Sequence, residues 1–201
     1  MQLVIATSSP DKFREIREML AVPGINFLGL ADFPGCPEVA EDGADFFANA
    51  LQKAQAAAYH TGLPSLADDS GLEVDALGGR PGVYSARFAG SGSTGRENND
   101  KLLQLLASVP DGRRKARFVC VVALVAGGRA YYARGEVDGE ISREPRGLGG
   151  FGYDPVFWLP EHGLTMAEME PNEKNKISHR SLALLRIRPV LLHLAGKTEK
   201  P

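Results

Sequence analysis

The stretch ARFVCVVALVAGGRAYYARG, residues 116–135, decides the fold class. An apolar run from Ala116 to Ala126 and a second segment from Arg129 to Gly135 flank Gly127-Gly128, and a glycine pair between two such runs is typical of a tight β-hairpin. Antiparallel strands are therefore expected. Strand and helix patterns alternate in the rest of the chain, which favours parallel pairs as well. We predict an α/β protein with a mixed β-sheet rather than a purely parallel one.

The segments around the hairpin follow this alternation. Apolar runs rich in branched residues predict strands, and apolar residues at helical spacing predict helices. The expected strands are Leu3–Ala6, Ile25–Leu30, Ser65–Ala67 and Pro155–Leu159, and the expected helices are one carrying Phe13, Ile16 and Leu20 on one face, Asp45–His60, Arg96–Ala107 and Ser178–Leu194, the last bent or ended by Pro189.

The length and composition of the chain are those of a globular protein and argue against several other classes of protein. With 201 residues, 43% hydrophobic and 24% charged, the chain predicts one domain over residues 1–195 and a short flexible tail over 196–201. Its longest apolar runs are too short for a membrane span, and no export signal is visible, so we expect a cytoplasmic protein without a membrane partner. A net charge of −2 argues against binding nucleic acid through a broad basic surface.

A first candidate site is the junction Thr7-Ser8-Ser9-Pro10-Asp11-Lys12. A strand end that leads into a helix N-terminus directs backbone N–H groups and a positive dipole at one place, which suits a phosphate. Ser9 fits the N-cap, and Pro10 fits the first helical position. For this segment alone, a well-capped helix is the simpler interpretation.

A second candidate is Asp68-Asp69-Ser70-Gly71, placed at the end of a short apolar strand. Two adjacent carboxylates are costly to bury unless they are paired, and a metal ion would remove that cost. Neighbouring side chains of an extended chain point to opposite faces, so we expect at most one of the two to meet a metal directly. An Asx-type turn with solvated carboxylates is the alternative interpretation.

Two further segments combine glycine, aromatic and basic residues. Gly147–Gly152 matches a dinucleotide-binding pattern formally, but no helix follows it, so we expect a flexible backbone that presents Phe151 and Asp154 to a base. Lys174–Arg180 gathers cations where the last helix is expected to begin, which opposes the helix dipole unless an anionic ligand binds there.

Taken together, six segments resemble the inosine triphosphate pyrophosphatase family, whose members hydrolyse deaminated purine nucleoside triphosphates. The segments occur in the family's order and cover nearly the whole chain. They are Thr7–Lys12; Glu41-Asp42-Gly43 with Asn49-Ala50 and Lys53-Ala54; Ala67–Leu72; Gly78–Arg87; Gly149–Pro155; and Ile177–Arg180.

The resemblance implies an elongated mixed sheet flanked by helices, two lobes around a central nucleotide-binding cleft, a homodimer and a Mg²⁺ requirement. It implies hydrolysis of ITP, dITP and XTP to the monophosphate and pyrophosphate. Asp69 and Glu41 would bind Mg²⁺, and Asp69 or Asp68 would take a proton from the attacking water. The implied phosphate-binding residues are Lys12, Lys53 and Lys174, and the implied base-binding residues are Phe151, Asp154, His179 and Arg180; Thr7, Ser8, Ser9, Pro10, Asp11, Ser70, Gly152 and Tyr153 complete the expected substrate site.

This chain departs from the family pattern at two places. Thr7-Ser8-Ser9 stands where the family often has Thr-Gly-Asn, and Asp45–Ala50 lacks the glutamate of Thr-Phe-x-Glu-Asn-Ala. Two alternatives stay open: a Maf-like pyrophosphatase for pyrimidine nucleotides, and a nucleotide-binding sensor without turnover. Ser178-His179-Arg180 favours the purine substrate, and the carboxylate pair favours catalysis.

Overall fold

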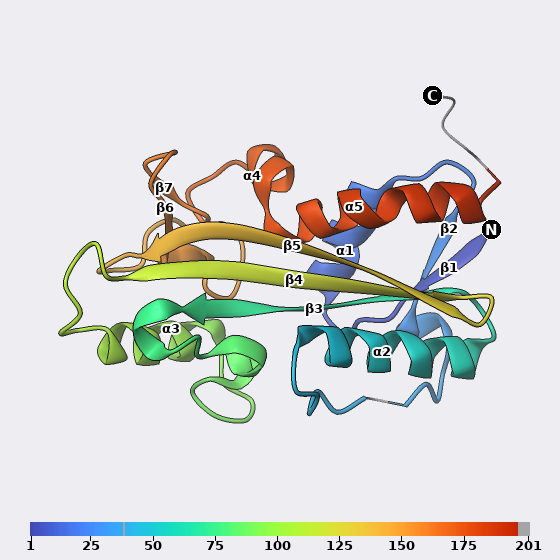
Figure 1. Cartoon of the computed structure of the whole chain (residues 1–201), viewed down its shortest axis with the longest axis horizontal. Coiled ribbons are helices and arrows are strands. Elements are labelled where there is room, and N and C mark those ends of the chain that lie inside the picture. Colours follow the sequence, from blue (N-terminus) through green and yellow to red (C-terminus); the bar gives the residue numbers. More distant parts are fainter. Residues whose placement is uncertain (38, 197–201) are drawn as a thin grey trace. The chain divides into compact units, whose positions relative to one another are not determined.

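The strands of the computed structural model, which describes residues 1–37 and 39–196, form one seven-stranded sheet (Figure 1). The strands are β1 (Gln2–Ile5), β2 (Asn26–Gly29), β3 (Ser65–Val74), β4 (Lys115–Ala126), β5 (Arg129–Ile141), β6 (Phe157–Leu159) and β7 (Leu164–Thr165). Their order is β2-β1-β3-β4-β5-β6-β7. Because β1 pairs in parallel with β2 and β3, and β6 pairs antiparallel with β5 and β7, the predicted mixed sheet is confirmed.

Five α-helices accompany the sheet in the described residues. They are α1 (Pro10–Leu20), α2 (Phe46–Thr61), α3 (Gly95–Leu105), α4 (Pro171–Ile177) and α5 (His179–Leu194). In the part of the chain that the structure describes, no helix has both the length and the apolar composition to cross a membrane. Of the predicted tail, residues 197–201 lie outside the described residues.

The chain divides into two compact units. The first unit contains Met1–Asp69, Cys120–Gly135 and the described residues from His179 onward, and the second unit contains Ser70–Val119 and Glu136–Ser178. Strands β3, β4 and β5 each contribute residues to both. The expectation of one domain over residues 1–195 stays a prediction.

Each unit has its own apolar core. In the first unit, α1 and α5 lie on one side of the strands and α2 on the other (Figure 1), and buried residues of α1 and α5, such as Ile16 and Leu184, pack with Leu66 of β3. In the second unit, Leu102 of α3 packs with Leu72 of β3 and Phe157 of β6. Burial of such side chains contributes about 1.5–3 kcal/mol each.

Two local predictions are confirmed in atomic detail. Gly127 and Gly128 connect β4 to β5 with φ of 55° and 75°, a left-handed conformation that glycine adopts without steric cost. Ser9 is the N-cap of α1, where its side chain accepts a hydrogen bond from the Lys12 backbone N–H, and Pro10 occupies the first helical position.

One predicted boundary was wrong. Strand β3 does not end before Asp68 but continues to Val74, because the buried pattern resumes at Leu72 and cations neutralise the carboxylates. The cation-rich segment lies where the last helix begins, as expected, since α5 starts at His179; the structure adds a separate helix, α4, which contains Lys174.

The predicted end of the last helix at Leu194 is confirmed, and Pro189 lies inside this helix without ending it. Helix α5 continues to Leu194 because buried residues on both sides of the proline, Ile187 and Leu191 among them, hold it in the core of the first unit.

Candidate functional site

Asp68 and Asp69 lie inside β3, and their side chains contact opposite layers of the first unit. Both are almost fully buried, at 1% and 4% exposure. Asp68 contacts residues of α1 and α5, whereas Asp69 contacts residues of α2. The expected alternation of neighbouring side chains along an extended chain is therefore confirmed.

The carboxylate of Asp68 is held by two cations. Its Oδ2 lies 3.2 Å from Lys12 Nζ and accepts hydrogen bonds of 3.2 Å from both Nε and Nη2 of Arg180. Nη1 of Arg180 donates to Oε2 of Glu15 at 2.5 Å. Burial lowers the pKa of Arg180, but Asp68 and Glu15 outweigh it and raise that pKa overall. This buried network joins β3 to α1 and α5 through the Asp68 carboxylate.

Asp69 has a different environment on the α2 side. Its Oδ2 accepts a hydrogen bond of 2.8 Å from Asn49 Nδ2, and its Oδ1 lies 3.8 Å from Lys53 Nζ. Burial raises the pKa of Asp69, while Lys53 and Asn49 oppose the rise without cancelling it. A carboxylate with a raised pKa is a better proton acceptor than an ordinary one.

Lys53 joins Asp69 to Glu41. Its ammonium lies 2.5 Å from Glu41 Oε1, and both residues are mostly buried. Burial lowers the pKa of Lys53, but Asp68, Asp69 and Glu41 together raise it above its ordinary value. The two side chains that look like isolated surface charges in the sequence therefore belong to the same cluster as Asp69.

The donor set of this cluster fits a magnesium ion that arrives with phosphates. Within residues 1–37 and 39–196, no three acidic, histidine or cysteine side chains gather closely enough to form a metal site of their own. Glu41 and Asp69 nevertheless supply two carboxylates around one point, now contacted by Lys53 Nζ. Mg²⁺ is usually held in this way, by one or two carboxylates together with substrate phosphates and water.

The junction before α1 is built as a capped helix start. Thr7 Oγ1 accepts a hydrogen bond from the Ser9 backbone N–H, and Ser9 Oγ accepts one from the Lys12 N–H. Ser8 and Pro10 are exposed, and the carboxylate of Asp11 pairs with Arg14. Lys12 is the member of this segment that reaches the carboxylate cluster.

The second unit contains Phe151 and Asp154, which were expected to bind the purine base of the nucleotide. Asp154 Oδ2 accepts hydrogen bonds from the Phe151 backbone N–H at 2.8 Å and from Lys174 Nζ at 2.7 Å. The Lys174 ammonium lies 5.1 Å from the centre of the Phe151 ring, within range of a cation–π contact. Asp154 and Lys174 are buried, so each neutralises the other in the core of this unit.

The remaining predicted residues are Tyr153, Gly152, Ser70 and His179. Tyr153 donates its hydroxyl to the Ser85 carbonyl at 2.8 Å, and its burial raises the pKa of that hydroxyl. The Gly152 carbonyl accepts a hydrogen bond from Asn99 Nδ2. Ser70 is half-buried on β3 in the second unit, and His179 is the first residue of α5 in the first. The roles assigned to these residues from the sequence stay predictions.

Sequence analysis missed two polar contributors to the first-unit cluster. Asn49 lies four residues before Lys53 on α2, and Glu15 lies three residues after Lys12 on α1. Residues three or four apart share one face of a helix, so helical spacing from the predicted lysines could have indicated both.

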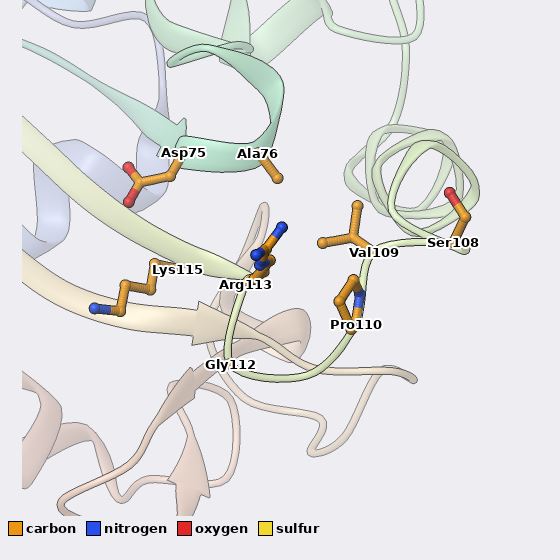
Figure 2. Close-up of a pocket in the computed structure, with 8 residues that line it drawn as sticks. All are labelled: Asp75, Ala76, Ser108, Val109, Pro110, Gly112, Arg113 and Lys115. Carbon is orange, nitrogen blue, oxygen red and sulfur yellow. The ribbon is translucent and has the colours of Figure 1, made fainter.

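A separate hollow lies in the second unit, and none of the predicted site residues lines it. Its volume is about 580 Å³, and Figure 2 shows the side chains of Asp75 and Lys115 on one side of the view and Val109 and Pro110 on the other. Its full lining is Asp75, Ala76, Ser108, Val109, Pro110, Gly112, Arg113 and Lys115. The lining carries charges of both signs, which gives it no clear preference for an anion or a cation.

Comparison with known proteins identifies relatives that match along nearly the whole chain. The model of the Ham1 family matches residues 3–190. A dITP/XTP pyrophosphatase of Geobacter sulfurreducens is 53% identical over 184 residues, covering 91% of this chain and 92% of its own. One of Desulforamulus reducens is 51% identical over 195 residues, covering 96% and 97%. The structure of a HAM1 protein from Coxiella burnetii superposes with a TM-score of 0.89 at 43% identity, covering 96% of this chain and 99% of that one.

Proposed function

This chain belongs to the Ham1 family, and we propose that it hydrolyses the deaminated purine nucleotides ITP, dITP and XTP to the monophosphate and pyrophosphate. The observation that carries the proposal is the buried cluster in which Lys53 contacts both Glu41 and Asp69. Such a cluster offers carboxylates to a metal and a cation to phosphates. Relatives at about half identity that are dITP/XTP pyrophosphatases support dITP and XTP as substrates, and the resemblance adds ITP.

Glu41 and Asp69 would hold Mg²⁺, which would neutralise charge on the phosphates during displacement. Lys12 and Lys53 would bind phosphate oxygens, since both ammonium groups already lie beside the carboxylates of β3. Of the two aspartates, Asp69 is the better candidate to orient water and accept its proton, because its pKa is raised by burial. Asp68 would hold Lys12 and Arg180 in place.

For two residues we propose roles other than the base recognition that the resemblance implied. Nε, Nη1 and Nη2 of Arg180 already donate to Asp68 and Glu15, so we propose that Arg180 positions Asp68 rather than reading the base. Asp154 would likewise position Phe151 and Lys174, to which it is hydrogen-bonded. Phe151 would stack on the purine ring, and His179 would form a hydrogen bond with the edge of the purine.

A panel of nucleoside triphosphates tests the proposal. Pyrophosphate release from dITP, XTP and ITP should exceed release from ATP, GTP, dTTP and UTP by at least about tenfold in kcat/KM, since one unpaired buried polar group costs about 1–3 kcal/mol. Preference for dTTP or UTP would instead indicate a pyrimidine nucleotide pyrophosphatase. Tight binding of dITP without any release would indicate a sensor.

Two expectations from the resemblance can be tested on the purified protein. The homodimer stays a prediction, which sedimentation equilibrium checks. The Mg²⁺ requirement also stays a prediction: EDTA should abolish pyrophosphate release, and added Mg²⁺ should restore it.

A further inference from the structure

The side chain of Asn49 connects three segments of the first unit. It is 1% exposed on α2. Its Nδ2 donates to Asp69 Oδ2 at 2.8 Å, and its Oδ1 accepts from the Gly43 backbone N–H at 2.7 Å. The amide is therefore used at both ends, as a donor toward β3 and as an acceptor toward the loop before α2.

The first of these hydrogen bonds orients the Asp69 carboxylate. With Oδ2 bonded to the Asn49 amide, Oδ1 is the oxygen that lies toward Lys53, at 3.8 Å from its Nζ. A carboxylate held at one oxygen cannot rotate freely about its terminal bond. The bond from Asn49 thus selects which oxygen of Asp69 is presented beside Lys53 and Glu41.

The second hydrogen bond holds the loop that carries Glu41. Gly43 follows Glu41 by two residues, and a Cβ added to Gly43 would lie 2.6 Å from Asn49 Oδ1 and 2.9 Å from Ala48 Cβ. The loop backbone therefore packs directly against α2. Because Glu41 is also paired with Lys53 on the same helix, α2 fixes the loop at two points.

We propose that Asn49 is a positioning residue that holds Asp69 and the Glu41 loop in the arrangement that binds the metal ion. This inference rests on the proposed function for the identity of the two metal ligands. Asn49 itself touches neither metal nor substrate. An amide suits this position because its donor and its acceptor are separate atoms, so Nδ2 can reach a carboxylate while Oδ1 accepts from a backbone N–H.

The test compares Asn49→Ala and Asn49→Ser with the control Asn98→Ala. Alanine removes both hydrogen bonds of Asn49, and serine is too short to span Gly43 and Asp69. Asn98 is a matched control on α3 of the second unit, because it is 4% exposed and bonds Ala89 N–H and the Ala86 carbonyl. The Asn98→Ala substitution removes hydrogen bonds of the same kind, but none of them involves Asp69 or the Glu41 loop.

The main readout is binding of Mn²⁺, measured by electron paramagnetic resonance in the presence of the nonhydrolysable analogue α,β-imido-dITP. Loss of a residue that orients a metal ligand typically weakens metal binding by about 10–100-fold. Both Asn49 variants should show that loss, and the Mg²⁺ concentration for half-maximal turnover of dITP should rise by a similar factor. Asn98→Ala should match the wild type in both measurements.

Circular dichroism on the same samples separates positioning from misfolding. If Asn49→Ala does not fold, Asn49→Ser, which keeps a polar group near Gly43, carries the comparison. Metal binding by a folded Asn49 variant equal to the wild type, or an equal loss in Asn98→Ala, would overturn the proposal, as would absence of Mn²⁺ binding by the wild type or failure of both Asn49 variants to fold. If Mn²⁺ binding depends on Asn49 but the wild-type protein releases no pyrophosphate, the proposed function alone is overturned.

Discussion

Arg180 and Asp68 form a buried ion pair in which two guanidinium nitrogens, Nε and Nη2, both lie 3.2 Å from the same carboxylate oxygen. The pair joins α5 to β3, segments 112 residues apart in sequence. Its side chains are 3% and 0% exposed. Charges at this depth are stable only while both partners are present.

Replacing Arg180 with alanine should therefore lower the free energy of unfolding by about 3–5 kcal/mol, because it leaves Asp68 buried with less compensation. Urea unfolding checks this. Arg96→Ala is the control, since the Arg96 side chain is 92% exposed and its removal should change stability by less than about 0.5 kcal/mol. A loss below about 1 kcal/mol for the Arg180 variant would show that the pair does not hold α5.

Asp69→Asn should abolish most turnover without weakening the fold. We expect kcat for dITP to fall about 10²–10⁴-fold, since the amide can neither accept a proton nor supply charge to a metal. Burial raises the pKa of Asp69, so its ionised form is less favourable in the folded protein than in the unfolded chain. Above that pKa the variant should be at least as stable as the wild type without metal.

The stability difference between Asp69→Asn and the wild type should depend on pH. As pH falls through the raised pKa toward the ordinary aspartate pKa of 3.8, wild-type Asp69 becomes protonated and the stability difference should disappear. Thermal unfolding of both proteins between pH 8 and pH 4 measures it. A variant with near-full activity at saturating Mg²⁺ would contradict the role of Asp69.

Lys12→Ala should chiefly weaken substrate capture. Its ammonium lies beside Asp68 with its side chain 20% exposed, where it would meet phosphate in bound and transition states alike. We expect KM for dITP to rise about tenfold with a smaller change in kcat. Arg14→Ala, on the same helix with its side chain 60% exposed, should leave both unchanged. If KM and kcat of the Lys12 variant match the wild type, the start of α1 does not bind phosphate.

Asp154→Asn tests the aromatic loop of the second unit. The change keeps an acceptor for the Phe151 N–H but removes the charge that pairs with Lys174. A hydrogen bond to a charged group contributes about 1.5–3 kcal/mol, so KM for dITP should rise by roughly tenfold or more. Asp138→Asn removes an exposed partner of Arg117 and is the control. Steady-state kinetics with KM changed less than twofold would remove this loop from substrate binding.

Local features of the sequence predicted much of the fold. Gly127-Gly128 predicted the hairpin because glycine readily adopts the positive φ that two-residue hairpin turns favour. Ser9 and Pro10 predicted the start of α1 in the same way. Asp68 and Asp69 misled the prediction of β3, since their burial depends on cations that come from α1, α2 and α5.

The site was predictable in its residue types and less so in its contacts. Lys53, Glu41 and Asp69 form one cluster in the first unit, and Lys12 pairs with the neighbouring Asp68, while the roles that the resemblance implies for them stay predictions. That Arg180 bonds Asp68 could not be read from the sequence, because nothing local to a buried arginine indicates which distant carboxylate it will meet.

The central claim is that the reaction breaks the bond between the α and β phosphates, and the products formed from dITP test it most directly. Wild-type protein with Mg²⁺ should release dIMP and pyrophosphate in equal amounts, measured by ³¹P NMR and anion-exchange chromatography in the absence of any inorganic pyrophosphatase. Formation of dIDP with inorganic phosphate, and no pyrophosphate, would contradict the account.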